Sequence, residues 1–338
     1  MKVNYRAFEL PFHHPFTISK ATKTHQPTLI VELEMGPYKG YGEAPAITYY
    51  NIPVDKMIAD LERKKMFVEK FAFTDPERYW HYLHHLFPAN PFLVCALDMA
   101  GWDLYGKLKR QPLYKLWNTE FTSEVPLTDY TIGIDSVERM IEKIKEKPWP
   151  VYKIKMGFVN DIDVITELRK YTDAIFRVDV NEGWTTEEAM AKVDILSKMG
   201  VELIEQPLRK DNWEGMKLLY NHSTIPLIAD ESCVAENDVE KCAGYFHGIN
   251  IKLTKCSGIT PARRMIAKAK ERGLLVMMGS MNESTIGTAA AVNFIPQLNF
   301  IDADGPLLLQ TDLATGLDYE MGKIQPPSAA GLGVNVHY

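Results

Sequence analysis

Several features that would assign a class of protein are missing from the sequence. The 338 residues include only four cysteines, which form no CxxC pair, and this argues against a disulfide framework or a cysteine-based zinc site. No apolar run in the chain approaches the roughly 18 residues that a membrane-spanning helix needs. The start of the chain, MKVNYRAFEL, alternates charged and apolar residues, unlike the apolar region of a signal peptide. We therefore expect a reduced, cytoplasmic protein with no membrane partner.

An excess of positive charge is missing as well. The formal net charge is −6, which argues against a nucleic-acid partner. Hydrophobic residues make up 46% of the chain and charged residues 24%, as in ordinary soluble globular proteins. A chain of 338 residues is long enough for one large domain and a smaller one.

The first third of the chain mixes strand and helix patterns. Residues 2–10, 27–36 and 39–47 predict three short strands, the last two joined by a Gly-Pro turn. From Val54 to about Leu116 the pattern becomes helical, with apolar residues at helical spacing in PFLVCALDMAGWDLYGKLK. This part of the chain therefore predicts an α+β unit.

From about Val125 strands and helices alternate. The predicted strands are VPLTDYTIGI, VYKIKMG, AIFRVDVN, VELIEQP, IPLIADES, HGINIKL, LLVMMGS and NFIDAD. One of the helices between them begins with a capping box, Thr185-x-x-Glu188, and stops at Gly200. About eight such strands over ~180 residues favour an α/β barrel. An open doubly wound sheet is the alternative, but its Gly-rich dinucleotide fingerprint is missing after the first strand.

Three carboxylates end successive strands of this predicted barrel. Asp179, Glu205 and Asp230 follow one another at intervals of 26 and 25 residues, and barrel enzymes carry their chemistry at the carboxyl ends of the strands. A single Asp there is more often a helix cap, whereas three in succession indicate a shared site. Bare carboxylates would repel one another, but a hard cation with oxygen ligands, such as octahedral Mg²⁺, would hold them together.

Lysines flank these carboxylates. Lys155 ends the second predicted strand and Lys252 the sixth, so they approach from opposite sides and could address two faces of one bound carbon. Lys153 shares a strand face with Lys155, where it could meet a substrate carboxylate or the ammonium of its neighbour. Asp302 and Asp304 end the eighth strand, again on one face.

These motifs together resemble the enolase superfamily and, within it, the muconate lactonizing enzyme subgroup. The resemblance covers essentially the whole chain, through ALDMAGWDLYGK, KIK, RVDVNEGW, IEQP, ADES, NIKLTKCSGI, MGSMNESTIG and GLGV. It implies a modified (β/α)7β TIM-type barrel at residues 121–310. It also implies an α+β capping domain at residues 1–120, completed by the C-terminal segment 311–338.

The resemblance also implies roles for individual residues. Mg²⁺ would be held by Asp179, Glu205 and Asp230, with Lys155 and Lys252 as the acid and base. The expected substrate contacts are Thr131, Lys153, Ser280, Met281, Asp302 and Asp304. The side chains expected to support the ligands from behind are Asn181 and Glu231.

Within the subgroup, the sequence DADGP is informative. Dipeptide epimerases carry a D-x-D here whose carboxylates receive the ammonium of the dipeptide, and Asp302 and Asp304 match it. Relatives that act on N-acyl amino acids or on o-succinylbenzoate precursors have no such ammonium to bind. The alternative for Asp304 is that it merely caps the turn at Gly305 and Pro306.

One segment departs from the pattern of alanyl-glutamate epimerases. They carry an arginine in a mobile loop over the site, facing the glutamate side chain, but no arginine occurs here between Arg6 and Arg63. The corresponding segment is 13–26, where Lys20 or Lys23 could substitute without the bidentate geometry of a guanidinium. We therefore expect a small or apolar second residue in the substrate, such as alanine.

The leading hypothesis is a Mg²⁺-dependent dipeptide epimerase that inverts the C-terminal residue of an Ala-Ala-type dipeptide through an enediolate. The alternatives are an L-Ala-D/L-Glu epimerase, or an N-acylamino acid racemase, o-succinylbenzoate synthase or cycloisomerase of the same subgroup. A barrel that only binds metal or peptide is a further alternative, but binding alone has no need of two lysine bases. A homo-oligomer is the expected assembly.

Overall fold

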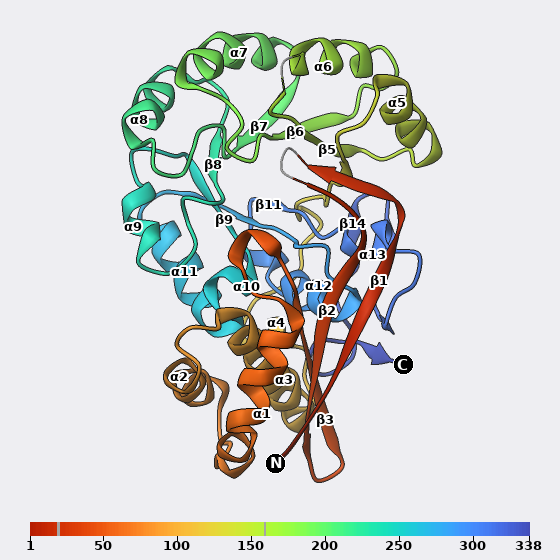
Figure 1. Ribbon diagram of the computed structural model, residues 1–338, viewed down its shortest axis with the longest axis vertical. Coiled ribbons are helices and arrows are strands. Elements are labelled where there is room, and N and C mark those ends of the chain that lie inside the picture. The colour runs from red at the N-terminus through yellow and green to blue at the C-terminus, as the bar shows by residue number, and fades with distance from the viewer. Residues whose placement is uncertain (19–20, 159) are drawn as a thin grey trace.

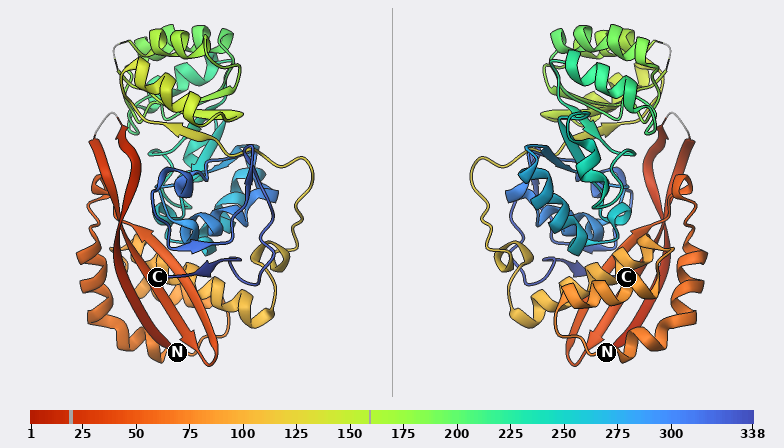
Figure 2. Two further views of the ribbon diagram at one scale, coloured as in Figure 1. Left: turned by 90° about the vertical axis from the view of Figure 1, so that its right-hand side faces the viewer. Right: turned by 90° about the vertical axis from the view of Figure 1, so that its left-hand side faces the viewer.

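The computed structural model describes residues 1–18, 21–158 and 160–338 (Figure 1). The chain begins with an antiparallel sheet in the order β1 (Lys2–Ile18), β2 (Ala21–Met35) and β3 (Tyr38–Pro45). The elements that follow are η1 (Thr48–Tyr50), α1 (Val54–Lys70), α2 (Pro76–Leu86), α3 (Pro91–Lys109) and α4 (Leu113–Leu116). This α+β unit lies at one end of the molecule, below the barrel in both views of Figure 2.

Glycines allow α3 to pack directly on β3. A Cβ added to Gly42 would lie 1.9 Å from the carbonyl oxygen of Ala96, and one added to Gly40 would lie 2.2 Å from that of Ala100. Small residues on both elements therefore let the two backbones approach, and most of α3 is buried.

The segment 13–26, expected as a loop, is instead largely strand. β1 and β2 continue past a register shift between Pro11 and Phe16 and pair again up to Ile18 and Ala21. Thr17 and Thr22 lie opposite each other and share a hydrogen bond of 3.0 Å between their hydroxyl oxygens. β-branched residues favour such pairing, so the hairpin extends as a two-stranded arm towards the barrel (Figure 1).

All eight predicted barrel strands form, in one parallel sheet in chain order. They are β4 (Tyr130–Ile132), β5 (Val151–Lys155), β6 (Ile175–Asp179), β7 (Val201–Glu205), β8 (Leu227–Ala229), β9 (Gly248–Ile251), β10 (Leu275–Met278) and β11 (Phe300–Ile301). A parallel bridge joins Thr128 to Ile301, and the Thr128 hydroxyl accepts a hydrogen bond of 2.8 Å from the Ala303 N–H. These contacts connect the first strand to the last, and the predicted barrel is confirmed.

Helices connect the strands. They are α5 (Val137–Glu146), α6 (Asp161–Arg169), α7 (Thr186–Lys198), α8 (Trp213–His222), α9 (Asp238–Cys242), α10 (Leu253–Cys256), α11 (Ile259–Glu271), α12 (Thr285–Val292) and, after the last strand, α13 (Gly305–Leu308). The capping box predicted for α7 is present, because Thr185 accepts from the N–H of Glu188 and Glu188 accepts from the N–H of Thr185. Gly200 follows that helix with a φ of +72°.

Strand alternation divides the barrel interior into two layers. Leu203, Ile228 and Met277 form a small buried cluster with Phe300 packed against it. Two positions after Leu203, Ile228 and Phe300, on the same face, stand Glu205, Asp230 and Asp302, whereas Gly279 follows Met277. An apolar layer thus closes the barrel beneath a charged layer at the carboxyl ends of the strands.

The C-terminal segment returns to the first unit. Leu332 donates its N–H to Asp103 of α3 at 2.9 Å, and Gly331 exchanges backbone hydrogen bonds with Gln111 and Leu113. The remaining short elements are η2 (Ile295–Gln297), β12 (Ala314–Thr315), β13 (Tyr319–Glu320), β14 (Lys323–Ile324) and β15 (Asn335–Val336). These contacts support the proposed cap of residues 1–120 with 311–338. Within the described ranges, no helix is long and apolar enough to cross a membrane.

Candidate active site

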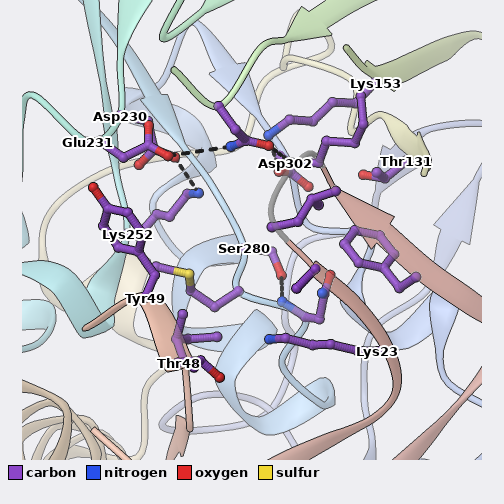
Figure 3. Close-up of a pocket in the computed structure, with 18 of the residues that line it drawn as sticks. Lys23, Thr48, Tyr49, Thr131, Lys153, Asp230, Glu231, Lys252, Ser280 and Asp302 are labelled. Carbon is purple, nitrogen blue, oxygen red and sulfur yellow. Dashed lines mark hydrogen bonds and ion pairs between the residues drawn. The ribbon is translucent and has the colours of Figure 1, made fainter. Parts of the chain in front are cut away.

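A pocket of about 300 Å³ opens at the carboxyl ends of the barrel strands. Residues of the β1–β2 arm (Phe16, Ile18, Ala21 and Lys23) and the segment around η1 line it from the cap side. Lys153 and Lys252 reach into it from opposite sides (Figure 3). Most of the predicted site residues line it, namely Thr131, Lys153, Lys155, Asn181, Asp230, Glu231, Lys252, Ser280, Met281, Asp302 and Asp304. Asp179 and Glu205 are fully buried beneath these.

The strand register brings the predicted ligands and lysines together. Lys155 pairs with Asp179 across β5 and β6, and Asp179 pairs with Glu205 across β6 and β7. Lys155 Nζ lies 2.6 Å from Asp179 Oδ2, and Lys252 Nζ lies 2.7 Å from Asp230 Oδ2. The charged layer is thus a set of buried ion pairs.

Lys153 occupies the centre of this set. Its Nζ lies 2.8 Å from Glu205 Oε2, 2.9 Å from Asp302 Oδ2 and 3.2 Å from Asp179 Oδ2. Burial would lower the pKa of this lysine, but Asp302, Glu205 and Asp179 outweigh burial and raise it well above its usual value. Lys153 is therefore a fixed cation in this arrangement.

The lysines hold the pKa of two of the three predicted metal ligands below its usual value, but not that of the third. Burial would raise the pKa of Asp179, but Lys155, Lys153 and Lys252 lower it to about 2. Lys252 and Lys255 likewise hold the pKa of Asp230 well below its usual range, against the effect of burial. Burial and the neighbouring Asp179 raise the pKa of Glu205. Glu205 is thus the least well compensated of the three.

The predicted ligands do not yet converge on one point. Among the described histidine, cysteine, aspartate and glutamate side chains, only those of Asp129, Asp302 and Asp304 bring three ligand atoms within 4.8 Å of one another. The reason is that ammonium groups stand between the predicted ligands, with Lys153 between Asp179 and Glu205.

The residues nevertheless fit a hard divalent cation. The three predicted ligands lie at one end of the barrel. They offer only oxygen atoms, which are the ligands that Mg²⁺ prefers. Glu205 Oε2 is buried and, in the described part of the chain, accepts no hydrogen bond, although Lys153 lies within ion-pair distance. Lys153 is shared with Asp179 and Asp302, so the charge of this buried oxygen is only partly compensated, and a metal ion would compensate it further.

The group of Asp129, Asp302 and Asp304 already has two cationic partners. Arg177 lies 3.0 Å from Asp129 and Lys153 lies 2.9 Å from Asp302. No lysine or arginine of the described residues lies within ion-pair distance of Asp304. Three carboxylates with two cations leave room for one further positive charge, which suits an ammonium group better than a divalent ion.

Asp304 is not the turn cap that the sequence left as an alternative. It stands at the N-cap position of α13, yet its side chain makes no capping hydrogen bond. Its Oδ2 instead accepts from the backbone N–H of Thr131 at 2.6 Å. Burial, Asp302 and Asp129 raise its pKa well above the usual value.

The expected supporting residues lie at the pocket wall. Asn181 donates its backbone N–H to Asp179 at 3.1 Å, and its side chain makes longer contacts of 3.5 Å with Lys155 and with Glu231. Burial and Asp230 raise the pKa of Glu231 to about 8. Ser280 donates its hydroxyl to Glu283 at 2.7 Å, which fixes the wall beside it.

Sequence reasoning missed four residues of the charged layer. Asn250 donates to Glu205 at 2.7 Å, and Gln206 accepts from the N–H groups of Asp230 and Ser232. Asp129 and Lys255 are both buried and ion-paired. Strand alternation could have found Asn250 and Asp129, which stand two positions before Lys252 and Thr131.

Of the two lysines considered for the missing arginine, Lys23 lines the pocket. It donates to Gln26 at 3.3 Å, and burial lowers its pKa. The neighbouring pocket surface is apolar, with Phe16, Ile18 and Ala21. Lys20 lies outside the described residues.

Comparison of the chain with known protein families shows which family it belongs to. Residues 2–117 match the N-terminal domain of the mandelate racemase / muconate lactonizing enzyme family, and residues 135–337 match the enolase C-terminal domain-like family. The chain therefore belongs to the mandelate racemase / muconate lactonizing enzyme family of the enolase superfamily.

Several relatives have named activities. The chain is 46% identical to an L-Ala-D/L-amino acid epimerase of Flavobacterium johnsoniae, over 99% of this chain and 100% of that protein. The substrate-liganded L-Ala-D/L-Glu epimerase of Bacillus subtilis superposes with a TM-score of 0.92 at 29% identity, over 99% of both chains. A dipeptide epimerase of Cytophaga hutchinsonii, complexed with Mg and D-Ala-L-Val, superposes with a TM-score of 0.91 at 25% identity, over 99% of this chain and 95% of that one.

Proposed function

We propose that this protein is a Mg²⁺-dependent dipeptide epimerase that inverts the α-carbon of the C-terminal residue of a small dipeptide. The observation that carries the proposal is a single pocket that has a lysine on each side of a layer of carboxylates. At the edge of this pocket lies Asp304, which has no lysine or arginine of the described residues within ion-pair distance. The named activities of the relatives are of the same reaction class. A cytoplasmic location and a homo-oligomeric assembly stay predictions.

Asp179, Glu205 and Asp230 would hold the metal. Mg²⁺ bound there would supply electrostatic stabilisation for the negative charge that develops on the substrate carboxylate when its α-proton leaves. Asn250 and Lys255 orient Glu205 and Asp230 from behind.

Lys155 and Lys252 would move the proton. One Nζ removes the α-proton of the C-terminal residue, and the other returns a proton to the opposite face, so that the configuration inverts. A lysine must be neutral to act as a base. Burial would lower the pKa of Lys252, but Asp230 and Glu205 outweigh burial and raise it above its usual value. The ion pair between Lys252 and Asp230 therefore has to open before Lys252 accepts a proton.

Asp302 and Asp304 would receive the ammonium of the dipeptide. Asp302 Oδ1 is buried and accepts no hydrogen bond from the described residues. In the same part of the chain, no lysine or arginine pairs with Asp304. Charge-assisted hydrogen bonds of this kind contribute roughly 1.5–3 kcal/mol each. Because they lie away from the reacting carbon, they serve to position the substrate.

Replacing Asp304 by asparagine should lower kcat/KM for free-amine dipeptides by roughly tenfold or more. The asparagine oxygen can still accept from the Thr131 N–H, and burial already disfavours the charged form of Asp304, so the fold should be retained. For an N-acetylated dipeptide the substitution should be neutral or favourable. Steady-state kinetics on both substrates test this, and an equal loss on both would argue against an ammonium site.

The apolar wall near Lys23 favours a small or apolar second residue. We expect a higher kcat/KM for Ala-Ala than for Ala-Glu, because burial disfavours the charged form of Lys23. The Lys23→Met protein should turn over Ala-Ala much as the parent does. A preference of several-fold for Ala-Glu in the parent that Lys23→Met abolishes would show that Lys23 receives the glutamate side chain.

A direct comparison of substrate classes tests the proposed function. With Mg²⁺ present, a free-amine dipeptide should be epimerised, and the N-succinylated form of its C-terminal amino acid should be a far poorer substrate. Faster turnover of the N-succinylated compound would assign the site to N-acylamino acid racemisation instead.

A further inference from the structure

Lys255 is a buried cation that the proposed reaction does not use. It lies on α10, three residues after Lys252, and its side chain has an exposed fraction of 0%. Unlike Lys252, it is not among the residues that line the pocket. A buried ammonium is costly unless its protons are satisfied, so its contacts indicate why it is there.

Its contacts converge on Asp230 and the adjoining backbone. Lys255 Nζ lies 2.5 Å from Asp230 Oδ1 and 2.6 Å from the Asp230 carbonyl oxygen. It also donates to the carbonyl oxygens of Cys233 and Asn250 at 3.0 and 3.2 Å. Four acceptors satisfy the three protons of the ammonium. Lys255 thus links the turn after β8 to the end of β9 and leaves no donor free for substrate.

The two oxygens of Asp230 consequently have different surroundings. Oδ1 faces Lys255 behind the pocket, whereas Oδ2 faces Lys252 in the pocket at 2.7 Å. With Oδ1 held by a buried ion pair, the carboxylate cannot turn to present both oxygens to one ion. Asp230 would therefore offer only its Oδ2 to a metal.

This restriction matters for the choice of metal. Mg²⁺ takes six ligands in a tight octahedron, whereas Ca²⁺ accepts more oxygen ligands and readily takes both oxygens of one carboxylate. A carboxylate fixed as a one-oxygen ligand suits Mg²⁺ and withholds a ligand from Ca²⁺. Hydrogen-bonding partners behind metal ligands commonly tune a site in this way.

We propose that Lys255 is a positioning residue that fixes Asp230 as a one-oxygen ligand and thereby sets the preference of the site for Mg²⁺ over Ca²⁺. The inference rests on the metal site of the proposed function. It concerns selectivity rather than the presence of the ion, so it can fail while that function holds.

The test is a pair of metal titrations on the full-length protein. Mg²⁺ and Ca²⁺ affinities are measured by competition against Mn²⁺, followed by electron paramagnetic resonance, for the parent and for Lys255→Met. Removal of the lysine charge strengthens attraction for both divalent ions, so the ratio of the two dissociation constants isolates the geometric effect. We expect this ratio to shift towards Ca²⁺ by about tenfold or more, the scale on which such supporting partners act.

Lys107→Met is the matched control. Lys107 lies 2.7 Å from the fully buried Asp103 in the cap, so its loss also disrupts a lysine–aspartate pair but should leave the metal ratio unchanged. An unchanged ratio in folded Lys255→Met would overturn the proposal for Lys255 while leaving the Mg²⁺ site in place. Failure of the parent to bind Mn²⁺ or Mg²⁺ would overturn both.

A crystal structure of the parent protein loaded with Mn²⁺ decides the matter if Lys255→Met does not fold. The proposal requires Asp230 Oδ2 on the metal and Oδ1 still on Lys255. Coordination of the ion by both oxygens of Asp230 would refute it.

Discussion

Lys252→Ala should lose epimerase activity, with kcat lower by at least about 10²–10⁴-fold, the usual contribution of a positioned acid or base. Lys155→Ala should lose it to a similar extent, because inversion needs a proton donor on one face of the α-carbon and an acceptor on the other. Chiral chromatography of the dipeptide after incubation with each protein measures the effect.

Both variants should remain folded. Without Lys252, Asp230 keeps its ion pair with Lys255, and without Lys155, Asp179 keeps Lys153 at 3.2 Å. Each single variant also keeps one base, so it should still exchange the α-proton of one configuration with solvent. Full inversion by either variant would contradict the assignment of the two lysines, and Lys107→Ala in the cap is a suitable control.

Loss of a carboxylate ligand is expected to have the second large effect. Glu205→Ala should abolish Mg²⁺-dependent turnover, since it removes a charged oxygen ligand from the centre of the site. The cation nearest to it, Lys153, keeps Asp302 and Asp179 as partners, so the protein should stay folded. Activity measured across a range of Mg²⁺ concentrations checks this, and full activity in EDTA would contradict a metal requirement.

Asp230→Ala should differ from Glu205→Ala in stability. It should abolish turnover as well, but it also removes Asp230 as the carboxylate partner of the buried Lys255 among the described residues. Breaking a buried ion pair by removing one partner costs about 3–5 kcal/mol. Chemical denaturation of the metal-free proteins should therefore show a clear loss for Asp230→Ala and a smaller one for Glu205→Ala.

The barrel and its strand-end residues could be predicted because they depend on local patterns. Strand alternation has a fixed period of two, and parallel strands end at one edge, so Asp179, Glu205 and Asp230 had to come near one another. The match of the chain to its family agrees with the fold that these patterns indicated.

What could not be predicted depends on contacts across the barrel. Nothing local distinguishes Lys255 from a surface lysine, because its partners Asp230 and Cys233 come from another strand–helix unit. Lys153 was placed on the correct face, but its position among three carboxylates depends on the barrel radius. The extended β1–β2 arm was not expected, because the family resemblance implied a loop over segment 13–26, whereas the renewed pairing of Phe16 with Lys23 depends on the register between two strands.

The central claim is the inversion of the C-terminal α-carbon of a dipeptide by two lysines in a Mg²⁺-dependent site. The most direct test is to incubate each epimer of an Ala-Ala dipeptide in D₂O with Mg²⁺ and follow the product by mass spectrometry and nuclear magnetic resonance. The account predicts that each epimer is converted to the other with one deuterium at the C-terminal α-carbon. Inversion without deuterium, or no reaction of any free-amine dipeptide with the metal-loaded protein, would contradict it.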